Sequence, residues 1–506
     1  MKNKIIYLIA ITLTLVSVTS CDDYLDISPE GQQNSENYFN NPQDFQDALV
    51  GVYDLLATTA LNNILGEIAS DNSLCGGENP TDVLDWQQID DMIHTPDNGE
   101  LRRVWQWMYA GISRANYIVE FQDKIDFEGK EKILAENLFL RSYYYFELVK
   151  FFGDVPMYTE GRVSIAESQT IDKTPKSEIY AKLEADLLAA TESLPWQQTQ
   201  QGRVTKGAAW ALLGKIYLYQ NKFNESADAL NKVIASGQYQ LVSDFSRIFK
   251  NNNENNVESV FEVQYSGSQE GAGFGCFQCV EGNYVVGFMG PRFRGGDFTP
   301  YASGFSFNVP VQELVNAYDS GDTRLESTIL DIEAFVSTRP DVTYNLGAEH
   351  TGYFNKKYIP YADDIVLQDQ NINRSNNYRA IRLADVLLMA AEAEVQSGGS
   401  NGESYLNQVR ERAYGNNSQD YTAAEGSLLE AIYTERRKEL AGEGHRFFDL
   451  VRTGKAKIAF DAFNASKPAE FNTVNYIENK HGIFPIPLVE LQLANAVEKW
   501  GQNPNY

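Results

Sequence analysis

Apolar residues recur at helical spacing along most of the chain. Two early segments show the pattern clearly: one contains Phe45, Leu49, Val52, Leu55 and Leu56, and the other contains Leu101, Trp105, Met108, Ile112, Ala115 and Val119. Residues three or four positions apart lie on one face of an α-helix, so each segment predicts an amphipathic helix. Further helices are expected at 133–152, 179–194, 205–220, 225–236, 383–395, 405–413 and 428–440, and near Leu491. The pattern predicts a mostly α-helical protein.

One predicted helix pair carries the spacing of a tetratricopeptide repeat. The first helix of such a repeat follows the pattern W-x-x-L-G-x-x-Y, which is met here by Trp210, Leu213, Gly214 and Tyr217. The glycine would let the second helix approach closely. We therefore predict tetratricopeptide-like helix pairs that stack into a scaffold, with Trp210 and Tyr217 buried between two antiparallel helices.

Residues 251–380 form a loop-rich insert with a different pattern. Residues 257–265 predict a strand, and 266–308 are rich in glycine and aromatics without helical periodicity. The aromatic residues of this stretch are Phe274, Phe277, Tyr284, Phe288, Phe293, Phe298, Tyr301, Phe305 and Phe307. Long loops held by a rigid scaffold often bind ligands. We expect this side, with its short strands, to be the ligand-binding side.

The N-terminus predicts export and lipidation. Lys2 and Lys4 precede an apolar run at 5–18, which is too short to span a bilayer and fits a signal peptide. Small residues lead directly to Cys21, as in a lipobox, so we predict cleavage after residue 20 and attachment of diacylglyceryl and palmitate chains to Cys21. No later segment is expected to cross a membrane.

The expected domain organisation follows from these patterns. Residues 1–20 are the signal peptide, and the polar stretch 21–41 is an extended, lipidated tether. Residues 42–506 form a single domain, because the helical pattern continues across every possible division and the 251–380 insert lies inside it.

The net charge of the chain limits the classes of partner that it can bind. The formal net charge is −27 at pH 7, and removal of Lys2 and Lys4 with the signal peptide makes it more negative. Such a protein repels phosphate groups, so nucleic acid is excluded as a partner and neutral or cationic ligands are favoured.

Catalytic motifs are lacking in the sequence. The four histidines show no zinc-ligand spacing, and neither a nucleophile elbow nor a phosphate-binding loop occurs. The acidic patch at Glu443 and His445 is interpreted as a structural ion-pair corner. Cys276 and Cys279 form a C-x-x-C pair in a glycine-rich stretch, which favours loop thiols or a local disulfide over a redox or zinc site. We predict a protein that is not an enzyme, with no metal site and no cofactor apart from the lipid on Cys21.

Several short motifs together resemble those of one family. In the first half they are CDDYLD at 21–26, GVY at 51–53, LRSYYYF at 140–146, GDVP at 153–156 and GRVTKGAA at 202–209. In the second half they are ERRKEL at 435–440, GHRFFDLVRTG at 444–454, FPIP at 484–487 and QNPNY at 502–506. The chain is similar in these motifs to the SusD/RagB-like outer-membrane lipoproteins of Bacteroidetes.

This resemblance implies a function and a location. Such proteins are lipid-anchored at the cell surface and deliver a ligand to a SusC-type TonB-dependent outer-membrane transporter. The ligand implied is an oligosaccharide or polysaccharide, with a peptide as the alternative. The shared motifs belong mostly to the scaffold, so no ligand contact transfers from them.

The candidate ligand site rests on the chemistry of sugars. Sugar rings stack on aromatic faces, and their hydroxyls pair with amide, carboxylate and guanidinium groups. The candidate residues are Asp71, Asn72, Trp86, Asn283, Tyr284, Arg292, Phe293, Phe298 and Tyr301. We expect the scaffold to bring them to one surface, with at least two aromatics exposed together. The alternative is that the loop folds inward and its aromatics form a satellite core.

Overall fold

The computed structural model describes residues 38–267, 273–364, 366, 368, 369 and 371–506. The predicted signal peptide (1–20), Cys21 and the predicted tether up to residue 37 lie outside the described residues. The end of that tether is packed on the protein: Phe39 is fully buried against Phe45 and Phe121.

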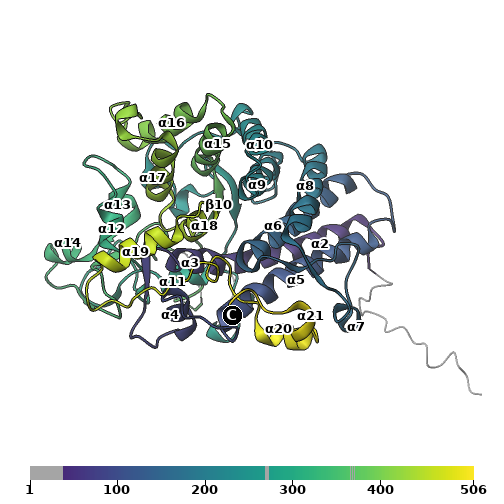
Figure 1. The fold of residues 1–506 in the computed structure, drawn as a ribbon, viewed down its shortest axis with the longest axis horizontal. Helices are drawn as coiled ribbons and strands as arrows, with labels where there is room; N and C mark the ends of the chain where they lie inside the picture. The colour runs from purple at the N-terminus through teal and green to yellow at the C-terminus, as the bar shows by residue number, and fades with distance from the viewer. Residues whose placement is uncertain (1–37, 268–272, 365, 367, 370) are drawn as a thin grey trace, which may run out of the picture.

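A succession of helices forms one half of the molecule (Figure 1). Neighbours in space are α5 with α6, α6 with α8, α8 with α9, α9 with α10, α10 with α15, and α15 with α16. Their bounds, with those of the preceding helices, are α2 Pro42–Asp54, α3 Ala60–Ile68, α5 Gly99–Phe121, α6 Lys130–Phe152, α8 Lys176–Ser193, α9 Lys206–Tyr219, α10 Phe223–Ala235, α15 Leu383–Ser397 and α16 Gly402–Tyr414. The prediction of a mostly helical fold with short strands is confirmed.

Capping and composition explain where these helices begin and how they pack. Asn41 accepts hydrogen bonds from the backbone of Gln43 and Asp44 and so caps α2, and Asn98 caps α5 in the same way. Helix α6 is buried on nearly all sides because α2, α5, α8 and α9 surround it. Its aromatic run at 143–146 fills these contacts.

The α9–α10 pair differs in one respect from the prediction. A Cβ on Gly214 would lie 2.5 Å from Leu230, so glycine does allow the close approach of the two helices. Trp210 and Tyr217, however, are only partly buried, and the ammonium of Lys232 lies 3.6 Å from the ring centroid of Trp210. The prediction that both are buried is therefore wrong, because Trp210 lies beside Lys232 of α10, whereas Leu213 on the same helix face is fully buried.

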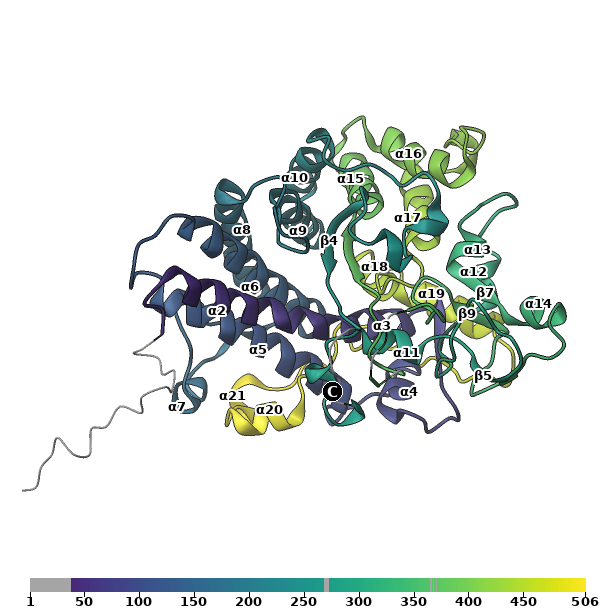
Figure 2. The same ribbon diagram turned by 180° about the vertical axis from the view of Figure 1, so that it is seen from behind.

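Most of the remaining elements are shorter and gather in the other half, whereas α7 lies at the far end of the helical half (Figure 2). Within the described residues the strands form two-stranded antiparallel ladders: β1 Ser73–Gly76 with β6 Phe307–Pro310, β2 Val155–Pro156 with β3 Lys173–Thr174, β4 Ser259–Val263 with β10 Tyr378–Arg382, β5 Arg292–Gly295 with β8 Thr343–Asn345, and β7 Ile329–Asp331 with β9 Tyr353–Asn355. The short helices are α4 Leu84–Asp90, α7 Ile165–Ser168, α11 Tyr284–Phe288, α12 Gln312–Val315, α13 Leu325–Thr328 and α14 Ile332–Ser337. The predicted strand at 257–265 is thus confirmed as β4.

The C-terminal helices pack on both halves of the molecule. They are α17 Leu428–Leu440, α18 Arg446–Arg452, α19 Ala456–Ser466, α20 Leu488–Leu493 and α21 Val497–Trp500. Helix α15 packs against α17, and α18 packs against α3. By length and composition the segment Pro42–Ile68 could cross a membrane, contrary to the expectation that no segment after the signal peptide could. However, 67% of its most apolar 18-residue window is buried, as in a core helix.

A network of ion pairs, here called the charged core, joins the C-terminal helices to the strands. Its members are Glu258, Arg324, Lys357, Arg382, Arg412, Glu435, Glu439 and Glu443. Arg382 contacts Glu258 at 2.8 Å and Glu443 at 2.7 Å, and Arg324 contacts Glu439 at 2.9 Å. Because these charges are buried and paired on several sides, they fasten β10 and α17 together.

Candidate functional site

Aromatic side chains from three segments enclose a cavity of about 390 Å³, here called the aromatic pocket. Its aromatic lining is Trp86, Phe274, Phe277, Tyr284, Phe288, Phe305 and Phe307, and its polar lining is Glu78, Asp82, Glu100, Arg103 and Arg292. Helices α4 and α11 both pack on α3, which brings Trp86 of α4 beside Tyr284 and Phe288 of α11 (Figures 1 and 2). The β1–β6 ladder sets Phe307 opposite Gly76 and so places the segment that carries Phe305 and Phe307.

The inner wall of the pocket is a set of packed rings. The ring centroid of Trp86 lies 5.0 Å from that of Phe288 and 5.1 Å from that of Phe307. Tyr284 stacks on Phe277 at 4.6 Å. Trp86 and Tyr284 are only 2% and 3% exposed, so their contribution to any ligand is limited to the edges that reach the cavity.

The outer wall is open to solvent. Phe274 is 57% exposed, and Phe277 and Phe305 are partly buried. The Phe274 ring lies 6.0 Å from Phe277 and 6.1 Å from Phe305. These three rings give the pocket an accessible apolar surface of the kind on which a flat ligand face can stack.

Charged groups border the rings and can donate or accept hydrogen bonds. The guanidinium of Arg292 contacts Asp82 at 2.7 Å and Glu78 at 3.5 Å and lies 5.3 Å from the ring centroid of Phe305. Arg103 lies at the same distance from Phe277 and pairs with Glu100 at 2.7 Å. Burial raises the pKa of the Glu100 carboxyl, although Arg103 opposes this effect.

A disulfide bond between Cys276 and Cys279 braces the outer wall. It closes the short loop that carries Phe277, and Phe274 lies two residues before this loop. Of the two states predicted for these cysteines, loop thiols or a local disulfide, the second is the one observed. The bond limits the conformations of the loop and so helps to hold the two rings in place.

Three of the predicted site residues meet at this pocket: Trp86, Tyr284 and Arg292. The prediction that at least two of the candidate aromatics are exposed together is wrong. Four of them, Trp86, Tyr284, Phe293 and Tyr301, are buried. The polar segment around Trp86 misled the prediction, because the indole turns away from that segment and packs on α11 and β6.

Phe293, Phe298 and Tyr301 form a separate cluster rather than part of the pocket. Phe293 and Phe298 stack at 4.5 Å, and Tyr301 packs on Phe335 at 5.4 Å and on Tyr361 at 5.6 Å. The expected alternative of a satellite core is what the structure has for these residues. The predicted single aromatic platform is therefore wrong in this part.

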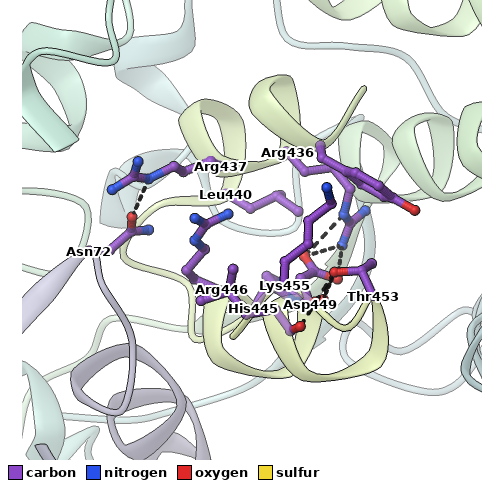
Figure 3. A pocket seen from close by; sticks show the side chains of 11 residues that line it. Asn72, Arg436, Arg437, Leu440, His445, Arg446, Asp449, Thr453 and Lys455 are labelled. Atoms are coloured by element: carbon purple, nitrogen blue, oxygen red, sulfur yellow. Dashed lines mark hydrogen bonds and ion pairs between the residues drawn. The ribbon is translucent and has the colours of Figure 1, made fainter. Parts of the chain in front are cut away.

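Asp71 and Asn72 contact arginines of α17 and α18, and Figure 3 shows Asn72 beside Arg437. Arg446 contacts both carboxylate oxygens of Asp71, at 2.7 and 2.9 Å, and Nε of Arg437 donates to Oδ1 of Asn72 at 2.8 Å. Burial alone would raise the pKa of Asp71, but Arg437 and Arg446 outweigh it and lower the pKa to about 2. The cavity there is about 20 Å³, room for water only. Placing these two residues in the ligand site is therefore wrong.

Asn283 is also structural. It is 3% exposed; its backbone N–H donates to the carbonyl of Arg374 at 2.7 Å and its side-chain amide donates to that of Asn376 at 3.0 Å. These bonds fix the start of α11 and so position Tyr284, but the side chain does not line the pocket. The prediction of a ligand contact at Asn283 is wrong.

A second, larger cavity of about 790 Å³ lies elsewhere on the same half. Its lining is mostly polar, with Asn251, Glu254, Tyr361 and Asp364 among the residues. The Tyr361 ring is already covered by the ammonium of Lys250, which lies 3.8 Å from its centroid. Burial raises the pKa of Glu254 to about 7. This cavity therefore offers less free aromatic surface than the aromatic pocket.

Comparison with known proteins identifies the family. The family profile described as "SusD family" matches residues 257–506, and the profile described as "Starch-binding associating with outer membrane" matches residues 23–218. SusD-like protein P2 from Formosa agariphila is 31% identical over 522 residues, which cover 97% of each chain. The chain belongs to the SusD family. The resemblance stated from its motifs is thereby confirmed.

Solved SusD-like structures share the fold over most of the chain. A laminarin binding SusD-like protein is 33% identical, with a TM-score of 0.81 over 92% of this chain and 100% of that one. Surface glycan-binding protein A from Bacteroides thetaiotaomicron, solved in complex with laminarihexaose, is 25% identical, with a TM-score of 0.81 over 91% of this chain and 99% of that one. These two relatives are named as binding proteins, which agrees with the prediction of a binding protein.

Proposed function

We propose that this SusD-family protein is a lipid-anchored, surface-exposed glycan-binding protein that delivers oligosaccharides to a SusC-type TonB-dependent transporter. The observation that carries the proposal is the aromatic pocket, where Phe274, Phe277 and Phe305 leave ring surface open beside Arg103 and Arg292. Exposed rings stack on the C–H faces of sugars, while guanidinium groups donate to hydroxyls.

The relatives suggest the class of glycan. Laminarin is bound by one SusD-like neighbour and laminarihexaose by another. We propose a laminarin-type glucan as the ligand of this chain, bound with its sugar rings against the outer wall of the aromatic pocket. Neutral glucans also suit a protein whose net charge is −27.

The proposed location rests on two observations. The predicted lipobox places a cysteine directly after the signal peptide, and the matched family profile is described as associating with the outer membrane. Acyl chains on Cys21 would hold the protein at the membrane while leaving residues 38–506 free to meet the transporter.

Binding calorimetry tests the ligand. Laminarihexaose should bind to the purified protein and be recovered intact after incubation, whereas starch oligosaccharides and basic peptides should bind more weakly. Phe277→Ala should weaken laminarihexaose binding several-fold, and Tyr361→Ala, in the second cavity, should leave it unchanged. Tighter binding of peptides, or loss of binding only in Tyr361→Ala, would contradict the proposed ligand or its site.

Cell fractionation tests the anchor and the partner. The wild-type protein should enter the outer-membrane fraction and co-purify with a TonB-dependent transporter after mild detergent extraction. Cys21→Ala should fold normally but leave the membrane fraction. The lipid-anchor proposal fails if the Cys21→Ala protein still partitions with the membrane.

A further inference from the structure

Three carboxylates meet at the end of the helix that carries Trp86. Asp90 is the last residue of α4, Asp91 follows it, and Glu349 comes from the loop between β8 and β9. One carboxylate oxygen from each lies within 4.8 Å of those of the other two. These residues, here called the acidic triad, are separate from the aromatic pocket lining.

Hydrogen bonds from other segments orient the acidic triad. The backbone N–H of Cys75 donates to Oδ2 of Asp90, and Asn472 donates its side-chain amide to Oδ2 of Asp91 at 3.0 Å. The backbone N–H of Asn472 also reaches Oε1 of Glu349 at 3.5 Å. Each carboxylate thus has one oxygen engaged by an N–H donor.

The remaining oxygens are the unusual feature. Asp90 is 2% exposed, yet its Oδ1 receives no N–H donor, and Oε2 of Glu349 is likewise buried without one, so without an ion the two carboxyls can pair only by sharing a proton. Buried polar atoms without partners are rare and costly. The two atoms belong to the same cluster, so a single bound group could satisfy both.

The charge of the acidic triad is poorly balanced by nearby cations. Among the described residues, none of the three carboxylates has a lysine, arginine or histidine nitrogen within 4.0 Å. Lys467 acts on Asp91 and Glu349 from a distance, but its ammonium donates to the carbonyl of Phe471 at 2.6 Å. A cation held directly by the carboxylates would balance them far better.

We propose that the acidic triad binds a divalent cation, Ca²⁺. Carboxylate oxygens are its preferred ligands, and Ca²⁺ accepts irregular oxygen sets completed by water, whereas Mg²⁺ demands near-octahedral geometry. The ion would join the end of α4 to the 347–349 loop, where the N–H of Ala348 donates to the carbonyl of Gly77 at 2.9 Å. It would therefore fasten the segment that positions Trp86.

Calorimetry and thermal unfolding of the purified protein test this site without any glycan. After treatment with a chelator and buffer exchange, the protein should bind one Ca²⁺ per chain, and Mg²⁺ more weakly. Added CaCl₂ should raise the melting temperature by about 2 °C or more.

Substitutions locate the ion. Asp90→Asn and Glu349→Gln should each weaken Ca²⁺ binding by roughly tenfold or more, because a charged ligand is lost. Without Ca²⁺ their melting temperatures should equal or exceed that of the wild type, since a buried like charge is removed. Asp97→Asn removes the same charge from an exposed position nearby and should bind Ca²⁺ normally.

Three results would overturn the proposal: no saturable Ca²⁺ binding by the wild-type protein, tighter binding of Mg²⁺ than of Ca²⁺, or equal Ca²⁺ affinity in the wild type and the Asp90→Asn/Glu349→Gln double variant. If that double variant does not fold, Asp91→Asn replaces it, because Asp91 is less buried and its substitution disturbs the core least. Unchanged Ca²⁺ affinity in Asp91→Asn then counts against the site.

Discussion

The charged core and the aromatic pocket both gather side chains from distant segments, but they differ in closure. In the charged core most buried charges meet opposite charges on more than one side, as Arg382 does with Glu258, Glu439 and Glu443. In the aromatic pocket the inner rings are packed and the outer rings are open. Closure marks a cluster that stabilises the fold, and incomplete closure marks one that can receive a ligand.

The largest effect should come from opening the charged core. Glu439→Ala leaves Arg382, Arg324 and Arg412 short of a buried partner, which should lower the free energy of unfolding by about 3–5 kcal/mol. Urea unfolding measures it. Laminarihexaose affinity of the folded protein should not change.

A matched control lies on the same helix. Glu430→Ala removes a surface ion pair with Lys455 and should cost less than about 1 kcal/mol. Equal losses for Glu439→Ala and Glu430→Ala would show that the charged core contributes no more than a surface pair.

The inner wall of the aromatic pocket should affect stability and binding together. Trp86→Ala removes a buried ring and should lower the free energy of unfolding by about 3 kcal/mol, with weaker laminarihexaose binding as well. Trp86→Phe keeps an aromatic ring and should retain most of both. A Trp86→Ala protein with unchanged stability would mean that the indole is not core packing.

The ion pair of Asp71 should make stability depend on acid. The folded pKa is about 2, below the unfolded value of about 3.9, so the stabilisation is present above about pH 4 and is lost as the pH falls towards 2. The loss amounts to about 2.6 kcal/mol, at about 1.36 kcal/mol per pKa unit. Urea unfolding at a series of pH values should show a shallower acid decline for Asp71→Asn than for the wild type.

The exposed control for this prediction is again Asp97→Asn. It should retain the acid decline of the wild type, because Asp97 lies in no ion pair within the described part of the chain. A wild-type decline identical to that of Asp71→Asn would show that Arg437 and Arg446 do not lower the pKa of this carboxyl.

The smallest effect should come from the outer wall and should separate binding from stability. Phe274→Ala removes an exposed ring, which should weaken laminarihexaose binding by about 1 kcal/mol, or roughly fivefold in Kd. The melting temperature should stay unchanged because Phe274 is 57% exposed. A lower melting temperature with unchanged Kd would reverse the roles assigned to the inner and outer walls.

Periodicity predicted the helices well because each long helix buries a regular face, as α5 does with Leu101, Trp105, Met108 and Ile112. The insert at 251–380 has no such periodicity, so the sequence could not show which of its side chains are buried. The prediction did bring Trp86, Tyr284 and Arg292 together, since stacking chemistry points to aromatics near polar groups.

The errors have a common physical origin. From the sequence, Asp71 and Asn72 resemble solvent-exposed polar residues. In the fold they are paired with Arg446 and Arg437, which lie near the other end of the chain. Asp90 and Glu349 are likewise far apart in the sequence and form no recognisable cation-binding motif. With 69 acidic residues in the chain, no particular pair of carboxylates can be chosen from the sequence alone. Contacts between distant segments decide which polar residues are free, and they follow from the fold alone.

The Cys276–Cys279 disulfide has a practical consequence for work with this protein. A disulfide persists in oxidising surroundings and is lost in a reducing cytosol. Because the bond braces Phe274 and Phe277 but lies outside the charged core, protein produced in a reducing compartment would melt normally yet recognise its glycan poorly. Preparations judged by thermal stability alone would pass as intact, so thiol content should be checked before affinities are compared.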